Sequence, residues 1–237
     1  MGDLYYIRHG FTPANNANYN KQREIYTIAD DCDMPLEIIY GREQARELGT
    51  FLNTIKGKTL IYVSPYRRTR ETLDIALDYM NGNYEIIVCD DLHEINVGVH
   101  YAKMKDEVLE EYPEAIEYYQ QMKNNPFKAT PIGGESFHDV IDRVKDISFD
   151  IYENAISNEY ANVFIFGHGT VNRFIYYNIT GVDNFPYQHN CEVIMGNGED
   201  IGRSVFMPKT FVPRGYKIIF DDYNEKQFVK MYNNRRF

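Results

Sequence analysis

Cysteine is scarce in this chain of 237 residues. The three cysteines, Cys32, Cys89 and Cys191, are odd in number and far apart, and they match no metal-binding spacing. They therefore predict buried or free thiols in a reducing compartment rather than a disulfide framework.

Long apolar runs are also missing. No stretch approaches the ~20 consecutive apolar residues that a membrane-spanning helix needs. No signal peptide precedes the first apolar segment, which begins at Leu4. We therefore expect a cytoplasmic protein that has no membrane partner.

Basic residues are fewer than acidic ones. The chain has 25 Lys and Arg against 35 Asp and Glu, a formal net charge of −10. Nucleic-acid phosphates are bound by broad basic surfaces, so this balance argues against a general nucleic-acid partner. A small anion remains compatible with it, because a few arginines in a cleft create a local positive field.

Interdomain linkers are absent as well. No Pro/Gly/Ser-rich stretch, composition break or internal repeat divides the sequence. A content of 43% hydrophobic and 25% charged residues is typical of a soluble globular protein. We expect one α/β domain that spans residues 1–237.

Three apolar segments along the chain each end in basic residues. Each segment is rich in β-formers and predicts a buried strand. The three segments are LYYIRHG (4–10), LIYVSPYRRTR (60–70) and VFIFGHG (163–169). The carboxyl ends of parallel strands lie at one edge of an open sheet, where ligands bind. We therefore expect Arg8, His9, Arg68 and His168 to share one pocket.

Helical spacing of apolar residues lies between these strands. It predicts helices over 41–55 and after Pro65, one or two helices over 101–123 that break near Pro113, and a helix from Val171 to Ile179. Ser136 and Asp139 form a capping-box pattern that begins a single helix reaching Ala155. Further strands are predicted at 84–88, 191–195 and 216–220, and a basic exposed tail at 232–237.

Two arginines and two histidines at one edge form a site for a dianion, since guanidinium groups donate to phosphate oxygens in a bidentate manner. Nearby guanidinium groups also keep an imidazole neutral, which makes His9 a plausible nucleophile for phosphorus. The leaving oxygen then needs a proton donor. Glu94 and Glu135 are the candidates, and Glu94 is favoured because it lies in an irregular segment just after a strand.

Five motifs, in order and spacing, resemble the histidine phosphatase superfamily, also called phosphoglycerate-mutase-like. They are IRHGFTPAN, SPYRRTRET, LHEIN, PIGGESFHDVIDRV and GHGTVNRFI, and they cover roughly residues 4–179. The resemblance implies a three-layer α/β/α sandwich with a mainly parallel central sheet. It also implies a helical lid insertion, with a variable substrate-pocket segment at about 100–132.

The same resemblance implies roles for individual residues. His9 is the phosphorylated nucleophile and Glu94 is the general acid and base. The implied phosphate-binding residues are Arg8, Asn15, Arg68, His168 and Gly169. Phe11, Thr12 and Glu135 are expected to border the substrate pocket, although Glu135 could instead cap or buttress a helix start. No metal ion or cofactor is implied.

Two departures from the family pattern affect the expected pocket. Phe11 stands where an acidic residue is usual. The sequence GVHYA (98–102) stands where many phosphatase members have Gly-x-Trp-Glu-Gly. That wall of the pocket is therefore not the common one, and the sequence does not predict which phosphomonoester is bound.

The function predicted from these residues is a metal-independent phosphatase that hydrolyses a small phosphorylated metabolite and exists as a monomer or homodimer. One alternative is a phosphoglycerate-type mutase, which shares the first half-reaction. Others are a catalytically weak module that binds phosphorylated ligands, and a metallohydrolase using His9, Glu94 and His168.

Overall fold

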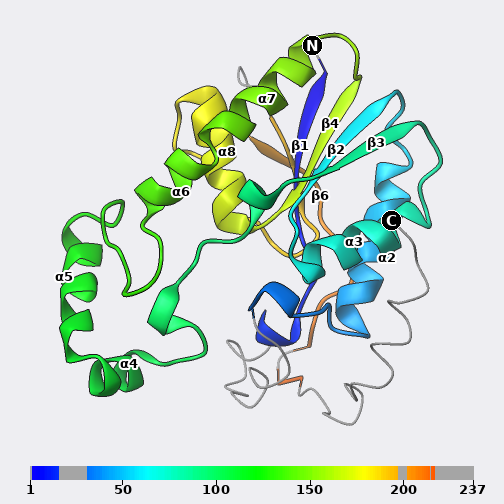
Figure 1. The fold of residues 1–237 in the computed structure, drawn as a ribbon. Helices are drawn as coiled ribbons and strands as arrows, with labels where there is room; N and C mark the ends of the chain where they lie inside the picture. Colours follow the sequence, from blue (N-terminus) through cyan, green and yellow to red (C-terminus); the bar gives the residue numbers. More distant parts are fainter. Residues whose placement is uncertain (1, 16–30, 197–201, 214, 217–237) are drawn as a thin grey trace.

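The computed structural model describes residues 2–15, 31–196, 202–213, 215 and 216. Its centre is a six-stranded sheet of order β3-β2-β4-β1-β5-β6 (Figure 1). The strands are β1 (Asp3–Arg8), β2 (Thr59–Val63), β3 (Tyr84–Val88), β4 (Asn162–Gly167), β5 (Val193–Met195) and β6 (Arg203–Phe206). Strands β1 to β4 are parallel, whereas β5 runs antiparallel to both β1 and β6.

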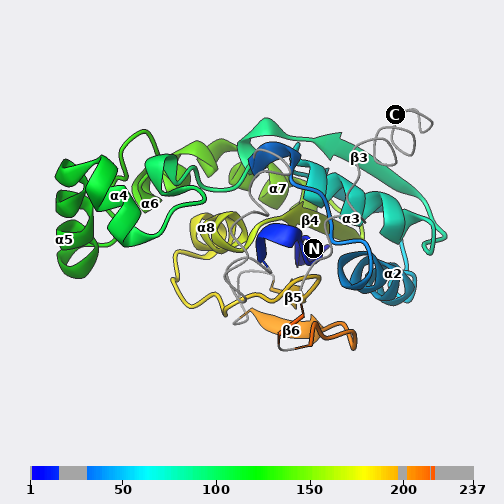
Figure 2. The same ribbon diagram turned by 90° about the horizontal axis from the view of Figure 1, so that it is seen from below.

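Helices cover both faces of this sheet, as Figure 2 shows. They are α2 (Tyr40–Leu52) and α3 (Arg67–Leu77) on one face, and α6 (Phe137–Arg143), α7 (Lys145–Ile156) and α8 (Gly169–Thr180) on the other. Successive strand side chains point to opposite faces. In β1, Tyr5 and Ile7 join the core under α2 and α3, and Leu4 and Tyr6 join the core under α6 to α8. The predicted three-layer α/β/α sandwich is confirmed.

The three strands with basic ends are neighbours in the sheet, in the order β2, β4, β1. Their register aligns Arg8 with Gly167 and Val63 with Phe166. The strands are parallel, so their carboxyl ends reach the same edge of the sheet. The segments that follow each strand are therefore side by side.

A helical insertion separates β3 from the helices that follow. It contains η3 (Asp90–Leu92), η4 (Gly98–His100), α4 (Lys105–Glu111), η5 (Pro113–Ala115) and α5 (Ile116–Asn124). The predicted interruption near Pro113 is confirmed, because η5 begins at this proline. Helices α4 and α5 lie to one side of the sheet in Figure 1.

Two predictions about helices and strands need correction. The helix expected over 136–155 is two helices, α6 and α7, since Val144 leaves helical geometry with ψ 5°. The strand expected at 191–195 begins only at Val193, because Cys191 has a φ of 53°, a left-handed turn conformation. The sequence analysis also missed β6. The strand predicted at 216–220 lies outside the described residues from 217 onward, as does the tail at 232–237.

The three cysteines are free thiols: Cys32 is exposed, Cys89 is half-buried and Cys191 is buried. Within the described residues, no helix combines the length and apolarity needed to cross a membrane.

Candidate active site

A cavity of about 260 Å³ opens at the carboxyl edge of β1, β2 and β4. Figure 2 views the molecule from the side of this edge. Six residues predicted from the sequence line it: Arg8, His9, Thr12, Asn15, Arg68 and Glu94. His168 lies against His9, with 5.2 Å between the two ring centres. The structure therefore brings together the basic residues that follow three separate strands.

His9 is buried and its ring is fixed by the backbone. Its Nδ1 lies 2.8 Å from the carbonyl oxygen of Gly10. A carbonyl oxygen only accepts hydrogen bonds, so Nδ1 carries the proton and Nε2 keeps its lone pair. Burial, followed by the charges of Arg68 and Arg8, holds the pKa of His9 well below 6.5. The ring is therefore neutral near pH 7, as a nucleophile requires.

His168 is fully buried beside His9. Its Nε2 lies 2.9 Å from Ser64 Oγ and 3.4 Å from Thr69 Oγ1. Ser64 Oγ already accepts the N–H of Tyr66 at 3.3 Å, so its own hydrogen can be donated to Nε2. This arrangement leaves the proton of the neutral ring on Nδ1. Burial is the main reason that the pKa of His168 is well below 6.5.

The two arginines are held by one guanidinium nitrogen each. Arg8 Nη1 donates to the carbonyl oxygen of Gln188 at 2.6 Å. Arg68 Nη1 donates to the carbonyl oxygen of Asp31 at 2.5 Å and to its carboxylate at 3.2 Å. Both Nε atoms are buried and have no hydrogen-bond partner among the described residues. The arginines are thus oriented while keeping donors for a ligand.

Unpaired donors are the strongest chemical signal of this site. The Nε atoms of Arg8 and Arg68 and Nδ1 of His168 are all buried without a partner in the described part of the chain. Buried donors in folded proteins are nearly always paired, because an unpaired one costs about 1–3 kcal/mol. Several such donors beside one cavity indicate a site built for an anion.

Asn15 and Thr12 close one side of the cavity. The N–H of Thr12 donates to Asn15 Oδ1 at 3.1 Å, and the N–H of Asn15 donates to Thr12 Oγ1 at 3.2 Å. Asn190 Nδ2 also donates to Asn15 Oδ1, at 3.1 Å. Oδ1 is thus occupied twice, whereas Nδ2 has no partner within the described residues. This amide can donate to an anion.

Glu94 lies in the irregular segment after η3, at the cavity wall. The N–H of Ile95 donates to its Oε1 at 2.9 Å. Burial is the largest influence on this carboxyl and raises its pKa above 4.5, and the charge of Asp31 adds to the effect, although Arg68 and Arg8 act in the opposite direction. A carboxyl group that stays protonated to a higher pH than usual can serve as a proton donor.

Residues from the far end of the chain support the site, and the sequence did not predict them. Asn190 Nδ2 lies 3.1 Å from the carbonyl oxygen of His9, and Gln188 supplies the acceptor for Arg8. Ser64 and Asp31 were also missed. Ser64 lay within a quoted motif, but nothing in the sequence pairs it with His168. No local pattern links position 8 to position 188.

Four predicted residues are not among those that line the cavity, and His168, described above, is one of them. Glu135 forms an ion pair with Arg143 at 2.8 Å and accepts the N–H of Asn96 at 2.9 Å, so it buttresses the loop before α6. Phe11 is a buried core residue. Gly169 begins α8, and a Cβ built there would meet Arg8 Nε at 3.8 Å, an ordinary contact.

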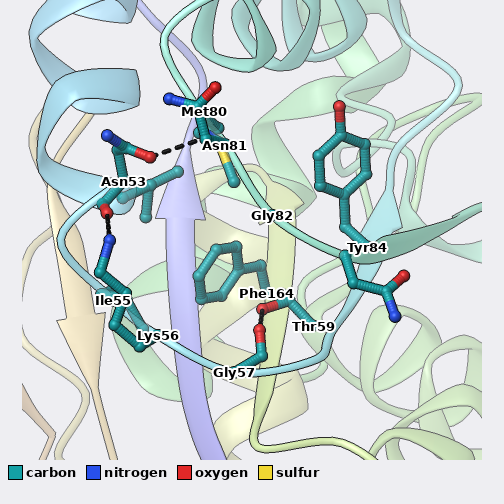
Figure 3. Close-up of a pocket in the computed structure, with 12 residues that line it drawn as sticks. Asn53, Ile55, Lys56, Gly57, Thr59, Met80, Asn81, Gly82, Tyr84 and Phe164 are labelled. Carbon is teal, nitrogen blue, oxygen red and sulfur yellow. Dashed lines mark hydrogen bonds between the residues drawn. The ribbon is translucent and has the colours of Figure 1, made fainter.

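A second cavity, of about 240 Å³, lies at the opposite edge of the sheet, where β2 and β3 begin (Figure 3). Its lining includes Asn53, Lys56 and Asn81, and the last two each donate a hydrogen bond to Asn53. The N–H of Asn81 donates to Asn53 Oδ1 at 2.8 Å, and Lys56 Nζ donates to the Asn53 carbonyl oxygen at 2.7 Å. None of the predicted site residues lines this cavity.

Metal ligation was one of the alternatives drawn from the sequence. Among the described residues, no group of three or more His, Cys, Asp or Glu side chains is arranged as metal ligands would be.

The fold and the site together define an α/β protein with an anion site at the carboxyl edge of a mainly parallel sheet. The sequence model of the histidine phosphatase superfamily (branch 1) matches residues 4–196. This chain belongs to that superfamily.

Similar proteins are phosphatases by name. Phosphoserine phosphatase 1 of Hydrogenobacter thermophilus is 31% identical over 144 residues, which are 60% of this chain and 64% of that protein. The α-ribazole phosphatase of Shigella flexneri has a similar structure, with a TM-score of 0.60 and 21% identity over 81% of this chain and 89% of that one. A mycobacterial glucosyl-3-phosphoglycerate phosphatase gives a TM-score of 0.63 at 18% identity, over 86% and 97% of the two chains. These structural similarities support the fold.

Proposed function

We propose that this protein hydrolyses a phosphomonoester through a phosphohistidine on His9. The observation that carries the proposal is the position of the His9 ring, which lines the cavity with its Nε2 unprotonated. The Nε atoms of Arg8 and Arg68, two residues of the same lining, are buried without a partner among the described residues. Such donors stabilise the charge of a phosphoryl group during transfer.

The first half-reaction forms a bond between His9 Nε2 and phosphorus and breaks the bond from phosphorus to the ester oxygen. Glu94 gives its proton to that oxygen, and the alcohol leaves. In the second half-reaction, water attacks phosphorus while Glu94 takes a proton from this water. The N–P bond breaks, inorganic phosphate leaves, and the protonated Glu94 and neutral His9 are restored.

The proposed substrate is a small phosphorylated metabolite, in keeping with a cavity of about 260 Å³. The relatives are named for phosphoserine, α-ribazole and glucosyl-3-phosphoglycerate. Phosphoserine, α-ribazole 5′-phosphate and glucosyl-3-phosphoglycerate are the first phosphate esters to test. The segment 97–102, which supplies Val97, His100, Tyr101 and Ala102 to the cavity wall, is proposed to distinguish among them.

The test is turnover of p-nitrophenyl phosphate with acid quenching and alkaline quenching during the reaction. We expect phosphate on His9 that is labile in acid and stable in alkali, inhibition by vanadate, and unchanged activity in EDTA. His9→Ala should abolish both turnover and labelling. His138→Ala, at the start of α6 and outside the cavity, is the matched control and should retain both.

Wild-type activity in His9→Ala would disprove the proposed mechanism. Product analysis with 3-phosphoglycerate separates hydrolysis from mutase action, because hydrolysis releases inorganic phosphate whereas a mutase returns an isomeric phosphate ester. Loss of activity in EDTA would instead favour metal-dependent chemistry.

A further inference from the structure

Asp31 places a carboxylate in the cavity that the sequence did not predict. It begins η2 (Asp31–Asp33) and lines the same cavity as His9 and Glu94. Its carbonyl oxygen accepts from Arg68 Nη1 at 2.5 Å, and its carboxylate lies at 3.2 Å from the same atom. The side chain is 37% exposed, so much of this carboxylate remains open to the cavity.

Among the described residues, the charges that line the cavity do not balance for a phosphate ester alone. Arg8 and Arg68 are the only Lys or Arg side chains among the described residues that line it. Together they offset the two negative charges of a phosphomonoester dianion. Glu94 is proposed to be neutral when the ester binds, since it then carries the proton for the leaving group. Asp31 keeps its bond to Arg68 Nη1, but its negative charge is then in excess, because the two arginine charges already offset the dianion.

A substrate can supply the missing positive charge. An uncompensated carboxylate a few ångströms from a bound dianion repels it, whereas an ammonium group between them attracts both. Met34, Val97 and Ala102, which are apolar, also line this cavity. We propose that Asp31 is a specificity-determining residue that selects phosphomonoesters carrying an amino group on a short chain. This inference rests on the proposed phosphatase function.

The experiment compares two probes of similar shape, O-phosphoethanolamine and n-propyl phosphate, which differ chiefly in an ammonium group in place of a methyl group. Their affinities are measured by titration calorimetry for His9→Ala and for His9→Ala with D31N, so that no turnover occurs. In His9→Ala, we expect phosphoethanolamine to bind at least about tenfold more tightly, as one charge-assisted hydrogen bond provides. With D31N added, the ratio should fall to about one, because propyl phosphate binds more tightly and phosphoethanolamine more weakly.

Asp33→Asn is the matched control, because it removes the same charge from the same short helix. The Asp33 carboxylate lies 3.7 Å from Arg67 Nη1 and does not line the cavity. The ratio of the two probe affinities should therefore stay as in His9→Ala. Equal affinities in His9→Ala, no detectable binding of phosphoethanolamine, or a preference unchanged by D31N would each overturn the inference. A parallel rise or fall for both probes would also overturn it, because Asp31 would then only repel phosphate or only position Arg68. Failure of the phosphatase proposal itself is read separately, from p-nitrophenyl phosphate turnover.

Discussion

Replacing Ser64 by Ala tests the arrangement beneath the cavity without altering any residue that faces it. Ser64 is fully buried just after β2, and its N–H is fixed to the carbonyl oxygen of Phe166 at 2.9 Å. Its hydroxyl lies 2.9 Å from His168 Nε2. The hydroxyl therefore decides which ring nitrogen of His168 carries the proton, and thus whether Nδ1 can donate to a phosphoryl oxygen.

The expected magnitude follows from the partners that Ser64→Ala removes. His168 Nε2 keeps only the longer contact to Thr69 Oγ1, at 3.4 Å, and the N–H of Tyr66 loses its acceptor. A buried polar group left unpaired costs about 1–3 kcal/mol, so the free energy of unfolding should fall by about that amount. Loss of one hydrogen bond to the transferred phosphoryl group should lower kcat/KM by about 10- to 100-fold.

The assay pairs urea unfolding with p-nitrophenyl phosphate kinetics and vanadate inhibition. Ser148→Ala is the matched control, since Ser148 is equally buried and its hydroxyl donates to the Val144 carbonyl oxygen at 2.6 Å, far from the cavity. We expect both variants to lose stability and only Ser64→Ala to lose activity and vanadate affinity. Wild-type kcat/KM in Ser64→Ala, or an equal loss in Ser148→Ala, would refute the role given to Ser64.

Four further predictions follow from the same geometry. Glu94→Gln should lower kcat/KM by about 10²- to 10⁴-fold and remove the alkaline limb of its pH profile, which the raised pKa of Glu94 places above pH 4.5. The pKa values of His9 and His168 are depressed in the folded protein, so below pH 6.5 the unfolded chain binds more protons than the folded one. The free energy of unfolding, measured in urea, should therefore fall as the pH is lowered below 6.5. This fall should be smaller in His168→Gln. Gly41→Ala should destabilise by about 1–3 kcal/mol in urea, because its Cβ would lie 2.1 Å from the Phe11 carbonyl oxygen, and an unchanged midpoint would contradict this. Asn190→Ala should lower kcat/KM for p-nitrophenyl phosphate about tenfold, because the His9 carbonyl oxygen keeps only the N–H of Cys191 at 3.2 Å as a donor, and wild-type kinetics would exclude that support.

The sequence predicts the strands at the centre of this fold because each is an apolar run that stops at polar residues. Strands β1, β2 and β4 each begin one residue before the predicted segments that start at 4, 60 and 163. Parallel pairing then brings their carboxyl ends together. The same runs do not reveal strand order, which depends on tertiary packing. An example is β3, an apolar segment that lies at the sheet edge with Ile87 43% and Val88 51% exposed.

The parts of the site that could not be predicted are those held by distant backbone. Asp31 reaches Arg68 from the short helix η2, and it holds this arginine partly through a carbonyl oxygen, a group that every residue has. Gln188 likewise receives Arg8 through its carbonyl oxygen. Periodicity and motifs describe side chains along one segment, so they carry no information about such contacts. Glu135 was given two readings from the sequence, and it follows the one in which it buttresses a helix start, because it forms a supporting ion pair and does not line the cavity.

The organisation of the site explains why its donors have no partner among the residues that the structure describes. Each of the two arginines is fixed through Nη1 to a backbone carbonyl oxygen, and His168 is fixed through Nε2 to Ser64, so the remaining donors cannot turn away to find partners. The folded protein without a ligand carries this cost in stability, about 1–3 kcal/mol for each unpaired donor. An anion that accepts from all of them recovers that free energy on binding. Fixed donors also need no reorganisation as charge shifts during transfer, so the same rigidity that lowers stability favours phosphoryl transfer.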